Sequence, residues 1–291
     1  MKKLISHSIK GLVASCSLLA LTFSNISIAH ERFMVPSHTV FSGDKVQYAT
    51  IISSISNDIF HPDRPLGNNN KGIDAGDLKP LFSLLESNVL LPNGETDSSI
   101  QWQAFQRLSV ADVPFSQSGT YRVSLVQKEV AMTTFKKANG APGRVFGPKP
   151  VIPEGASNIV RRTTAARVET FITLNEPSLN TFQPIGKGLE LTGKTHPNDL
   201  FAQEPAHFKL VYNGKAVPKN TQLKVIKAGT RHRNTRNEQI IKVNESGEFT
   251  FTPQKAGFYF LTAETALDIE QPANVDVKHD SLYVTLEVFP Q

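Results

Sequence analysis

Two stretches of the sequence share one spacing and decide the fold: Ser116-Gln-Ser-Gly-Thr-Tyr-Arg-Val-Ser124 and Pro253-Gln-Lys-Ala-Gly-Phe-Tyr-Phe-Leu261. In each stretch a glycine stands two residues before a tyrosine, where a turn ends and a strand opens. An Ig-like sandwich needs this arrangement at the corner where the chain passes from a sheet edge into the core. The repetition predicts two β-sandwich domains, one around each corner.

The rest of the chain also predicts short β elements. Its 291 residues include 18 Gly and 18 Pro, and alternating runs lie between Pro-Asn-Gly, Ser-Gly and Asn-Gly turns. The single helical prediction is Leu78–Glu86, with Asp77 as its N-cap. The segment Asn175–Lys187 contains two Pro and two Asn and divides the chain. We therefore predict an all-β fold of two consecutive antiparallel β-sandwiches, at residues 30–180 and 187–291.

Local patterns place the strands and loops of the first half. Predicted strands include Gln101–Leu108, Thr120–Thr134 and Ala166–Leu174. Two stretches rich in Gly, Pro and Asn, Phe60–Lys79 and Ala138–Asn158, are predicted as long loops. Loops of this length are usually functional or mobile.

Residues 1–29 have the three parts of a secretory signal peptide: a lysine-containing start, an apolar run over Gly11–Phe23, and small residues at Ser27 and Ala29. Cleavage there would make His30 the first residue of an exported, periplasmic chain. The apolar run of 13 residues is too short to span a membrane. No later run reaches the roughly 18 apolar residues of a spanning helix, so we predict a chain that does not span the membrane.

Cys16 offers an alternative start. Val13-Ala-Ser-Cys16 is compatible with a lipoprotein cleavage box that would leave Cys16 as a lipidated N-terminus. The apolar run continues past Cys16 to Phe23, whereas a lipoprotein box ends its apolar region. Cleavage before His30 is therefore the leading prediction.

The composition of the exported chain excludes several kinds of site. The 31 basic residues less the three lysines of the signal leave 28 against 26 acidic residues, a net charge of +2 that gives nucleic-acid binding little support. Cys16 is the one cysteine, so the exported chain has no disulfide, thiolate metal site or cysteine nucleophile. The sequence has no phosphate-binding loop, nucleophile elbow or His-Glu-x-x-His motif. We therefore predict no enzyme activity, no organic cofactor and no nucleic-acid partner.

The chain resembles a periplasmic family of largely unknown function in the phrase Ala29-His-Glu-Arg-Phe-Met-Val-Pro-Ser37 and in the turn Phe41-Ser-Gly-Asp-Lys-Val46. That family includes periplasmic components of nickel or cobalt uptake. The stretch Ser246-Gly-Glu-Phe-Thr-Phe-Thr-Pro253 resembles the family's prealbumin-like module. The resemblance implies Ig-like and prealbumin-like domains and a role in metal uptake, although this chain lacks the long His- and Asp-rich loop of some members.

His30 would present two nitrogen ligands to one metal ion, its α-amine and an imidazole nitrogen. The α-amine has a reference pKa of about 7.7 to 8.0, so it deprotonates far more easily than a lysine. The predicted further ligands are His38, in the turn beyond Pro36, and His61, in the loop before Pro62. Nitrogen donors with few carboxylates suit nickel, cobalt or copper better than calcium or magnesium.

Two other histidines are weaker predictions as ligands. His207 alternates with Phe208 and so points to the outer face of its strand. His232 lies in the basic run Arg231-His-Arg-Asn-Thr-Arg236, whose cations oppose metal binding. The run itself is predicted as a solvated hairpin tip.

The sequence leaves three function classes open. The leading hypothesis is a non-enzymatic periplasmic protein that captures a divalent transition metal for an envelope metal transporter or an outer-membrane receptor. The second is a structural, ligand-binding or glycan-binding β-sandwich module without metal. The third is a copper oxidase with His30 in an N-terminal histidine brace, which requires a second histidine opposed to the first. Metal retention by the cleaved chain separates the first class from the second.

Overall fold

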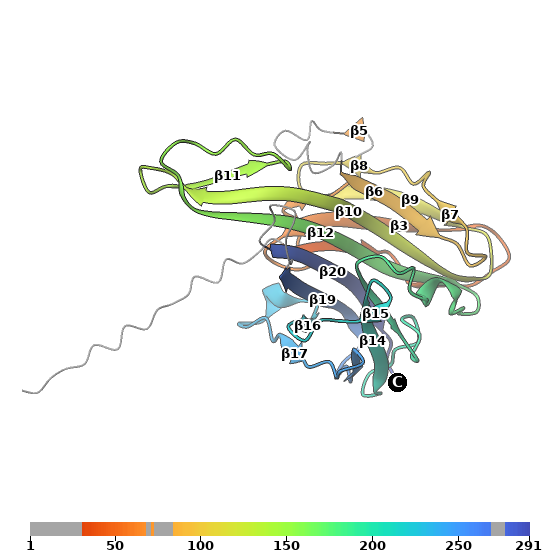
Figure 1. The fold of residues 1–291 in the computed structure, drawn as a ribbon. Helices are drawn as coiled ribbons and strands as arrows, with labels where there is room; N and C mark the ends of the chain where they lie inside the picture. Colours follow the sequence, from red (N-terminus) through yellow and green to blue (C-terminus); the bar gives the residue numbers. More distant parts are fainter. Residues whose placement is uncertain (1–30, 68–70, 73–83, 269–276) are drawn as a thin grey trace, which may run out of the picture.

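The computed structural model describes residues 31–67, 71–72, 84–268 and 277–291 (Figure 1). The predicted signal segment and His30 lie outside these ranges, as does most of the predicted helix Leu78–Glu86. The described residues form strands and two short 3-10 helices, η2 (Asn180–Phe182) and η3 (Thr230–His232). The all-β prediction is confirmed. Within the described ranges, no helix has the length and apolar character needed to cross a lipid bilayer.

Two of the three sheets are each built from only one half of the chain, the first sheet from the N-terminal half and the smallest sheet from the C-terminal half. The first sheet has the order β1 (Glu31–Pro36), β3 (Gln47–Ser56), β9 (Ser109–Phe115), β8 (Gln103–Ala104) and β5 (Lys71–Gly72), with β4 (Arg64–Pro65) beside β3. The smallest sheet has the order β13 (Leu189–Gly193), β14 (Ala206–Tyr212) and β15 (Lys215–Ala216), with β18 (Glu248–Phe251) beside β14.

The central sheet runs through both halves of the chain. Its order is β17 (Gln239–Ile241), β16 (Gln222–Lys227), β19 (Gly257–Asp268), β20 (Val277–Val288), β12 (Ser157–Leu174), β10 (Gly119–Lys136), β6 (Leu85–Leu90) and β7 (Thr96–Asp97), with β11 (Pro142–Phe146) beside β10 and β2 (Val40–Phe41) beside β12. Strand β12 pairs in parallel with β20, from Arg162 opposite Val277 to Thr170 opposite Thr285. This parallel join, which the sequence analysis did not predict, puts strands of both halves into one sheet.

Opposite faces of the central sheet bury two hydrophobic cores. Successive side chains of a strand point to opposite faces. On β12, Phe171 therefore lies in one core and Ile172 in the other, and on β19 the same alternation separates Phe260 from Leu261. The first sheet covers one core and the smallest sheet covers the other.

Both predicted corners are present and equivalent. Gly119 and Gly257 begin β10 and β19 with φ angles of 131° and 120°, a backbone region that glycine favours. The hydroxyl of Tyr121 donates to the carbonyl four residues before it at 2.9 Å, and that of Tyr259 does the same at 2.7 Å. The repeated spacing therefore identified a real structural repeat.

Four charged side chains are buried together on β10, β12 and β13, and we term them the buried charge cluster: Arg122, Arg167, Glu169 and Glu190. Arg122 Nη1 lies 3.6 Å from Glu190 Oε1, and Arg167 Nη1 lies 3.1 Å from Glu169 Oε1. Glu190 also accepts the backbone N–H groups of residues 185–187, at 2.8, 2.7 and 3.1 Å. One carboxylate thus ties the Pro-containing segment that divides the chain onto β13.

Three local predictions are wrong. The strand predicted at Gln101–Leu108 is reduced to the two residues of β8, and the main strand is β9, whose alternation includes Asp112 and Pro114 on its exposed side. The end of the predicted helix, Leu85–Glu86, begins β6, because pairing with β10 fixes an extended backbone there. The predicted loop at residues 138–158 contains β11.

Three strands continue beyond both cores as an arm, which we define as residues 130–162 (Figure 1). A register shift between Gln127 and Val130 marks where β10 enters it. Every residue of the arm is described, and none belongs to either core. Phe135 is buried instead against Gly143, where an added Cβ would lie 2.3 Å from the phenylalanine ring.

His196 is buried and bonded through both ring nitrogens. Its Nδ1 accepts the backbone N–H of Asn198 at 3.1 Å, so the proton is assigned to Nε2. Nε2 lies 2.9 Å from Thr120 Oγ1 and 3.2 Å from the carbonyl of Ser178. Burial lowers the pKa of His196, because the charged ring would lose its hydration, and the effects of Ser178 and Asp199 oppose this.

Replacing Glu190 by Gln should lower the free energy of unfolding by about 3 to 5 kcal/mol, because the change removes one of the carboxylates that face the buried Arg122. Urea unfolding followed by the fluorescence of the buried Trp102 measures this loss. Glu245→Gln is the matched control, because that carboxylate is 93% exposed and its removal should change stability by about 0.5 kcal/mol or less. Equal effects of the two substitutions would disprove the structural role of Glu190.

We expect stability to fall as the pH drops below about 6.5, partly through His196. The folded state keeps this ring neutral, whereas the unfolded chain protonates it below its ordinary pKa of 6.5. The stabilisation is therefore complete above that pH and is lost as the pH falls toward the lowered pKa of the folded state. His196→Gln should reduce the slope of unfolding free energy against pH, and the exposed His207→Gln should not. Identical slopes for all three proteins would refute this assignment.

Candidate functional site

Segments from both halves of the chain meet at the start of β1. Glu31 is the first residue of β1 and lies opposite Ser56, the last residue of β3. The turn after β3 and the segment that begins with η3 both reach this end of β1. We term the following residues the β1-end cluster: Glu31, Asp58, His61, His232 and Arg236.

Ion pairs join this cluster across the two halves. Arg236 Nη2 lies 2.5 Å from Glu31 Oε2, and Arg231 Nε lies 3.4 Å from Asp58 Oδ2. Thr230 Oγ1 also donates a hydrogen bond to Asp58. The basic run lies in the connection of the antiparallel hairpin β16–β17, and Arg231 and His232 are exposed there, as the sequence predicted. What the sequence did not predict is that Arg231 and Arg236 also bridge the two halves of the chain.

Glu31 is held within this bridge. Burial raises the pKa of Glu31, and Arg236 opposes that change through its charge and its hydrogen bond. Arg236 is shared, because its Nε also lies 3.2 Å from Glu238 Oε1. The carboxylate of Glu31 is therefore engaged by a cation.

His61 presents a ring nitrogen without a hydrogen-bond partner. Its backbone N–H donates to the carbonyl of Asp58 at 3.1 Å, which closes the turn after β3. Its Nε2 is buried and has no partner among the residues that the structure describes. Burial lowers the pKa of His61; Asp58 opposes this, and the nearby Arg231 and His232 lower the pKa further. The ring is therefore neutral at pH 7, the form that binds a metal ion.

Phe60 fixes the turn that carries His61. It has a left-handed φ of 60°, and its ring centroid lies 5.5 Å from that of Phe33 and 5.8 Å from that of Phe260. Phe33 belongs to β1 and Phe260 to β19. Aromatic packing thus positions His61 against both halves of the chain.

His38 lies at the other end of β1. It is exposed, and its ring centroid lies 5.5 Å from that of Phe41. Because β1 has six residues and a strand rises about 3.3 Å per residue, Glu31 and Pro36 lie roughly 17 Å apart. The structure therefore brings His61, and not His38, to the end of β1 that follows His30 in the sequence.

In the part of the chain that the structure describes, no three His, Cys, Asp or Glu side chains are arranged to hold a metal ion. A metal site at the β1-end cluster needs donors from outside the described ranges. His30 lies outside them and directly precedes Glu31 in the sequence.

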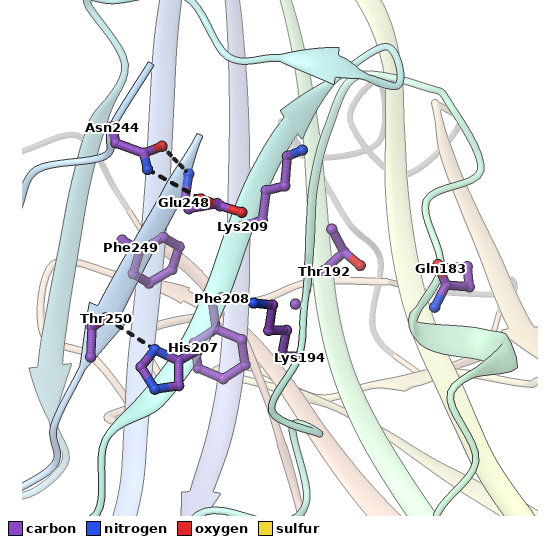
Figure 2. Close-up of a pocket in the computed structure, with 11 residues that line it drawn as sticks. Gln183, Thr192, Lys194, His207, Phe208, Lys209, Asn244, Glu248, Phe249 and Thr250 are labelled. Carbon is purple, nitrogen blue, oxygen red and sulfur yellow. Dashed lines mark hydrogen bonds between the residues drawn. The ribbon is translucent and has the colours of Figure 1, made fainter. Parts of the chain in front are cut away.

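A polar groove of about 500 Å³ lies on the smallest sheet (Figure 2). His207, exposed as predicted, places its Nδ1 3.2 Å from Thr250 Oγ1 on the neighbouring strand. Lys194, Lys209 and Glu248 also line the groove, so it offers charged groups of both signs to a small polar ligand. The groove could not be predicted from the sequence, because alternation shows only that His207 points outward and not which strands lie beside it.

A second cavity of about 370 Å³ lies beside the join between β12 and β20. Gln127 Oε1 is buried and unpartnered within the described residues, and Arg167 also lines the cavity. Burial raises the pKa of Tyr212, and its hydrogen bond with Asp280 raises it further. Tyr212 therefore keeps its proton and can act as a donor.

Solved structures resemble the chain only distantly. A Salmonella α2-macroglobulin reacted with methylamine is 12% identical with a TM-score of 0.23, and the match covers 89% of this chain but 15% of that one. Trypsin-activated α2-macroglobulin from Escherichia coli is 12% identical with a TM-score of 0.21, covering 88% and 23%. The two tandem V-type regions of a v-region-containing chitin binding protein are 8% identical with a TM-score of 0.19, covering 87% and 98%. TM-scores this low support no conclusion about the function of this chain.

Comparison with known protein sequences identifies a family for this chain. No curated protein sequence matches the chain significantly. A match to one protein family, however, includes the β1-end cluster, the groove and the arm. That match covers residues 27–267, and the chain therefore belongs to the family described as "Domain of unknown function (DUF4198)".

Proposed function

We propose that this protein is an exported periplasmic protein that captures a divalent transition metal, nickel, cobalt or copper, for an envelope transport system. The observation that supports this most is the neutral ring of His61, in the turn that reaches the start of β1, whose Nε2 has no hydrogen-bond partner among the described residues. If the signal is cleaved after Ala29, the α-amine and imidazole of His30 are joined directly to this end of β1. The resemblance to components of nickel and cobalt uptake points to the same chemistry.

The donors available to such a site are nitrogens. His30 supplies two and His61 a third, while His232 is near enough to affect the pKa of His61. The sequence argued against His232 because cations surround it. In the structure Arg231 and Arg236 each face a carboxylate, which offsets their charge. Nitrogen-rich sites suit nickel, cobalt and copper rather than calcium or magnesium.

The proposed role is capture and hand-off, without a catalytic step. Three nitrogen donors leave coordination positions open, so an envelope metal transporter or an outer-membrane receptor can take the metal by ligand exchange. A copper oxidase with a histidine brace would use the same pair, His30 and His61. Oxygen consumption by the copper-loaded protein with a reductant therefore separates an oxidase from a carrier.

The second candidate function is binding of a small polar ligand, such as a glycan, without metal. The groove on the smallest sheet favours it, because Lys194, His207 and Lys209 line an open surface there (Figure 2). This function would be lost in Lys209→Ala and retained in His61→Ala. Metal binding would instead be lost in His61→Ala and retained in Lys209→Ala.

In the protein that begins at His30, we expect His61→Ala to weaken nickel or copper binding at least about tenfold, or about 1.4 kcal/mol. One Gly added before His30 should weaken it to a similar degree, because it displaces the chelating amine. His38→Ala is the matched control and should leave the affinity unchanged, since His38 lies at the far end of β1. Isothermal titration calorimetry measures all four proteins. Absence of binding in the unaltered protein, or equal losses from His61→Ala and His38→Ala, would overturn the proposed site.

The affinity should also depend on pH in two stages. Below about pH 7.7 the α-amine must lose a proton for each metal bound, so the logarithm of the affinity should fall by about one per pH unit. Below about pH 6.5 the imidazole of His30 adds a second proton and the slope should approach two. His61, whose pKa is lowered by burial, adds its proton only at still lower pH. A flat profile between pH 8 and 6 is the result that would exclude the terminal amine as a ligand.

A further inference from the structure

The arm is a single-layered extension of the central sheet. Its strands β10 and β12 pair with each other out to Lys136 opposite Ser157, and β11 adds a third strand. Neither core contains any of its side chains, and in Figure 1 it projects away from the body of the molecule. Thr133 and Phe135 of the arm are buried, whereas the exposed residues of the arm include Lys136, Arg144 and Phe146.

The net positive charge of the exported chain lies in the arm. Residues 130–162 contain six basic residues and one acidic residue, a net charge of +5. The exported chain as a whole has a net charge of +2, so the remainder has a net charge of −3. The exposed cations of the arm are Lys136, Lys137, Arg144 and Lys149. None of these four takes part in an ion pair of the described residues.

Large apolar side chains lie exposed among these cations. Val151 is 86% exposed, Phe146 is 63% exposed and Ile159 is 38% exposed. The guanidinium of Arg144 lies 5.9 Å from the centroid of the Phe146 ring. A surface that combines unpaired cations with exposed aromatic and aliphatic side chains is typical of proteins that bind a membrane interface.

The free edge of β11 does not suit addition of a partner strand. Pro142 begins this strand, Arg144 lies in it and Pro148 follows it closely. Proline and charged residues are the usual means by which an edge strand avoids pairing. The side chains of the arm, rather than its backbone, are therefore the groups that a partner contacts.

We propose that the arm binds the surface of an anionic phospholipid membrane. Its cations face the lipid phosphates, and Phe146 and Val151 enter the interface between headgroups and acyl chains. The negative remainder of the chain is repelled by the same surface, so the arm is the part of the molecule that approaches it. This inference uses no residue of the β1-end cluster and stands whether or not the protein binds metal.

The test is flotation of the protein that begins at His30 with vesicles. We expect binding to vesicles of phosphatidylcholine and phosphatidylglycerol in equal amounts, none to phosphatidylcholine alone, and weaker binding as salt is raised. The triple variant Lys136→Gln, Lys137→Gln and Lys149→Gln should bind at least about tenfold more weakly. Val151→Ser should weaken binding without changing its dependence on salt.

A matched triple variant is the control. It replaces three exposed lysines of the body by Gln: Lys45, Lys215 and Lys255. It should bind vesicles as the unaltered protein does, and both triple variants should unfold at the same temperature as that protein. Equal weakening in the two triple variants, or equal binding to neutral vesicles, would refute the proposal. Binding to soluble polyglutamate as strong as binding to vesicles would assign the arm to an acidic protein partner and would also overturn it.

Discussion

The parallel pairing of β12 with β20 is the constraint on which the rest of the structure depends. It places strands of both halves in one sheet, and the alternation of side chains then supplies a core on each face. Arg167 and Glu169 of the buried charge cluster lie within the paired stretch of β12. Buried ion pairs add little net stability but tolerate few arrangements. Glu190, which binds the backbone of residues 185–187, accordingly fixes where the chain crosses into its second half.

This join explains why a site can exist at the start of β1. Domains connected only by a linker generally move relative to each other. Here η3, from the second half, is held against the turn that carries His61, and the ring of Phe60 packs on strands of both halves. The Nε2 of His61, which has no partner in the part of the chain that the structure describes, therefore has a fixed position relative to Glu31. Such positioning is what a metal site with few protein ligands requires.

The sequence predicted the features that depend on local spacing. The two corners could be predicted, because a glycine two residues before a tyrosine is a short-range pattern. The join could not, because it pairs Arg162 with Val277 and nothing near either residue identifies the other. The sequence could not show whether His38 or His61 lies near Glu31, because both histidines follow strands. Only the register of β1 on β3 shows that it is His61. Strand β9 was missed because Pro114 interrupts a pattern that its neighbours otherwise follow.

The arm and the β1-end cluster are linked mechanically through the same sheet. Strand β12 runs without interruption from Ser157 in the arm to Leu174 in the body, and its inner part holds the join to β20. Backbone hydrogen bonds pair β12 with β10 on both sides of the register shift at Gln127–Val130, so the arm has a defined direction relative to the rest of the sheet. Attachment of the arm to a surface would therefore orient the body as well, including His61 and the segment that follows η3. In a protein that passes its cargo to a membrane transporter, a fixed orientation increases the fraction of encounters that are productive, because fewer rotations must be searched.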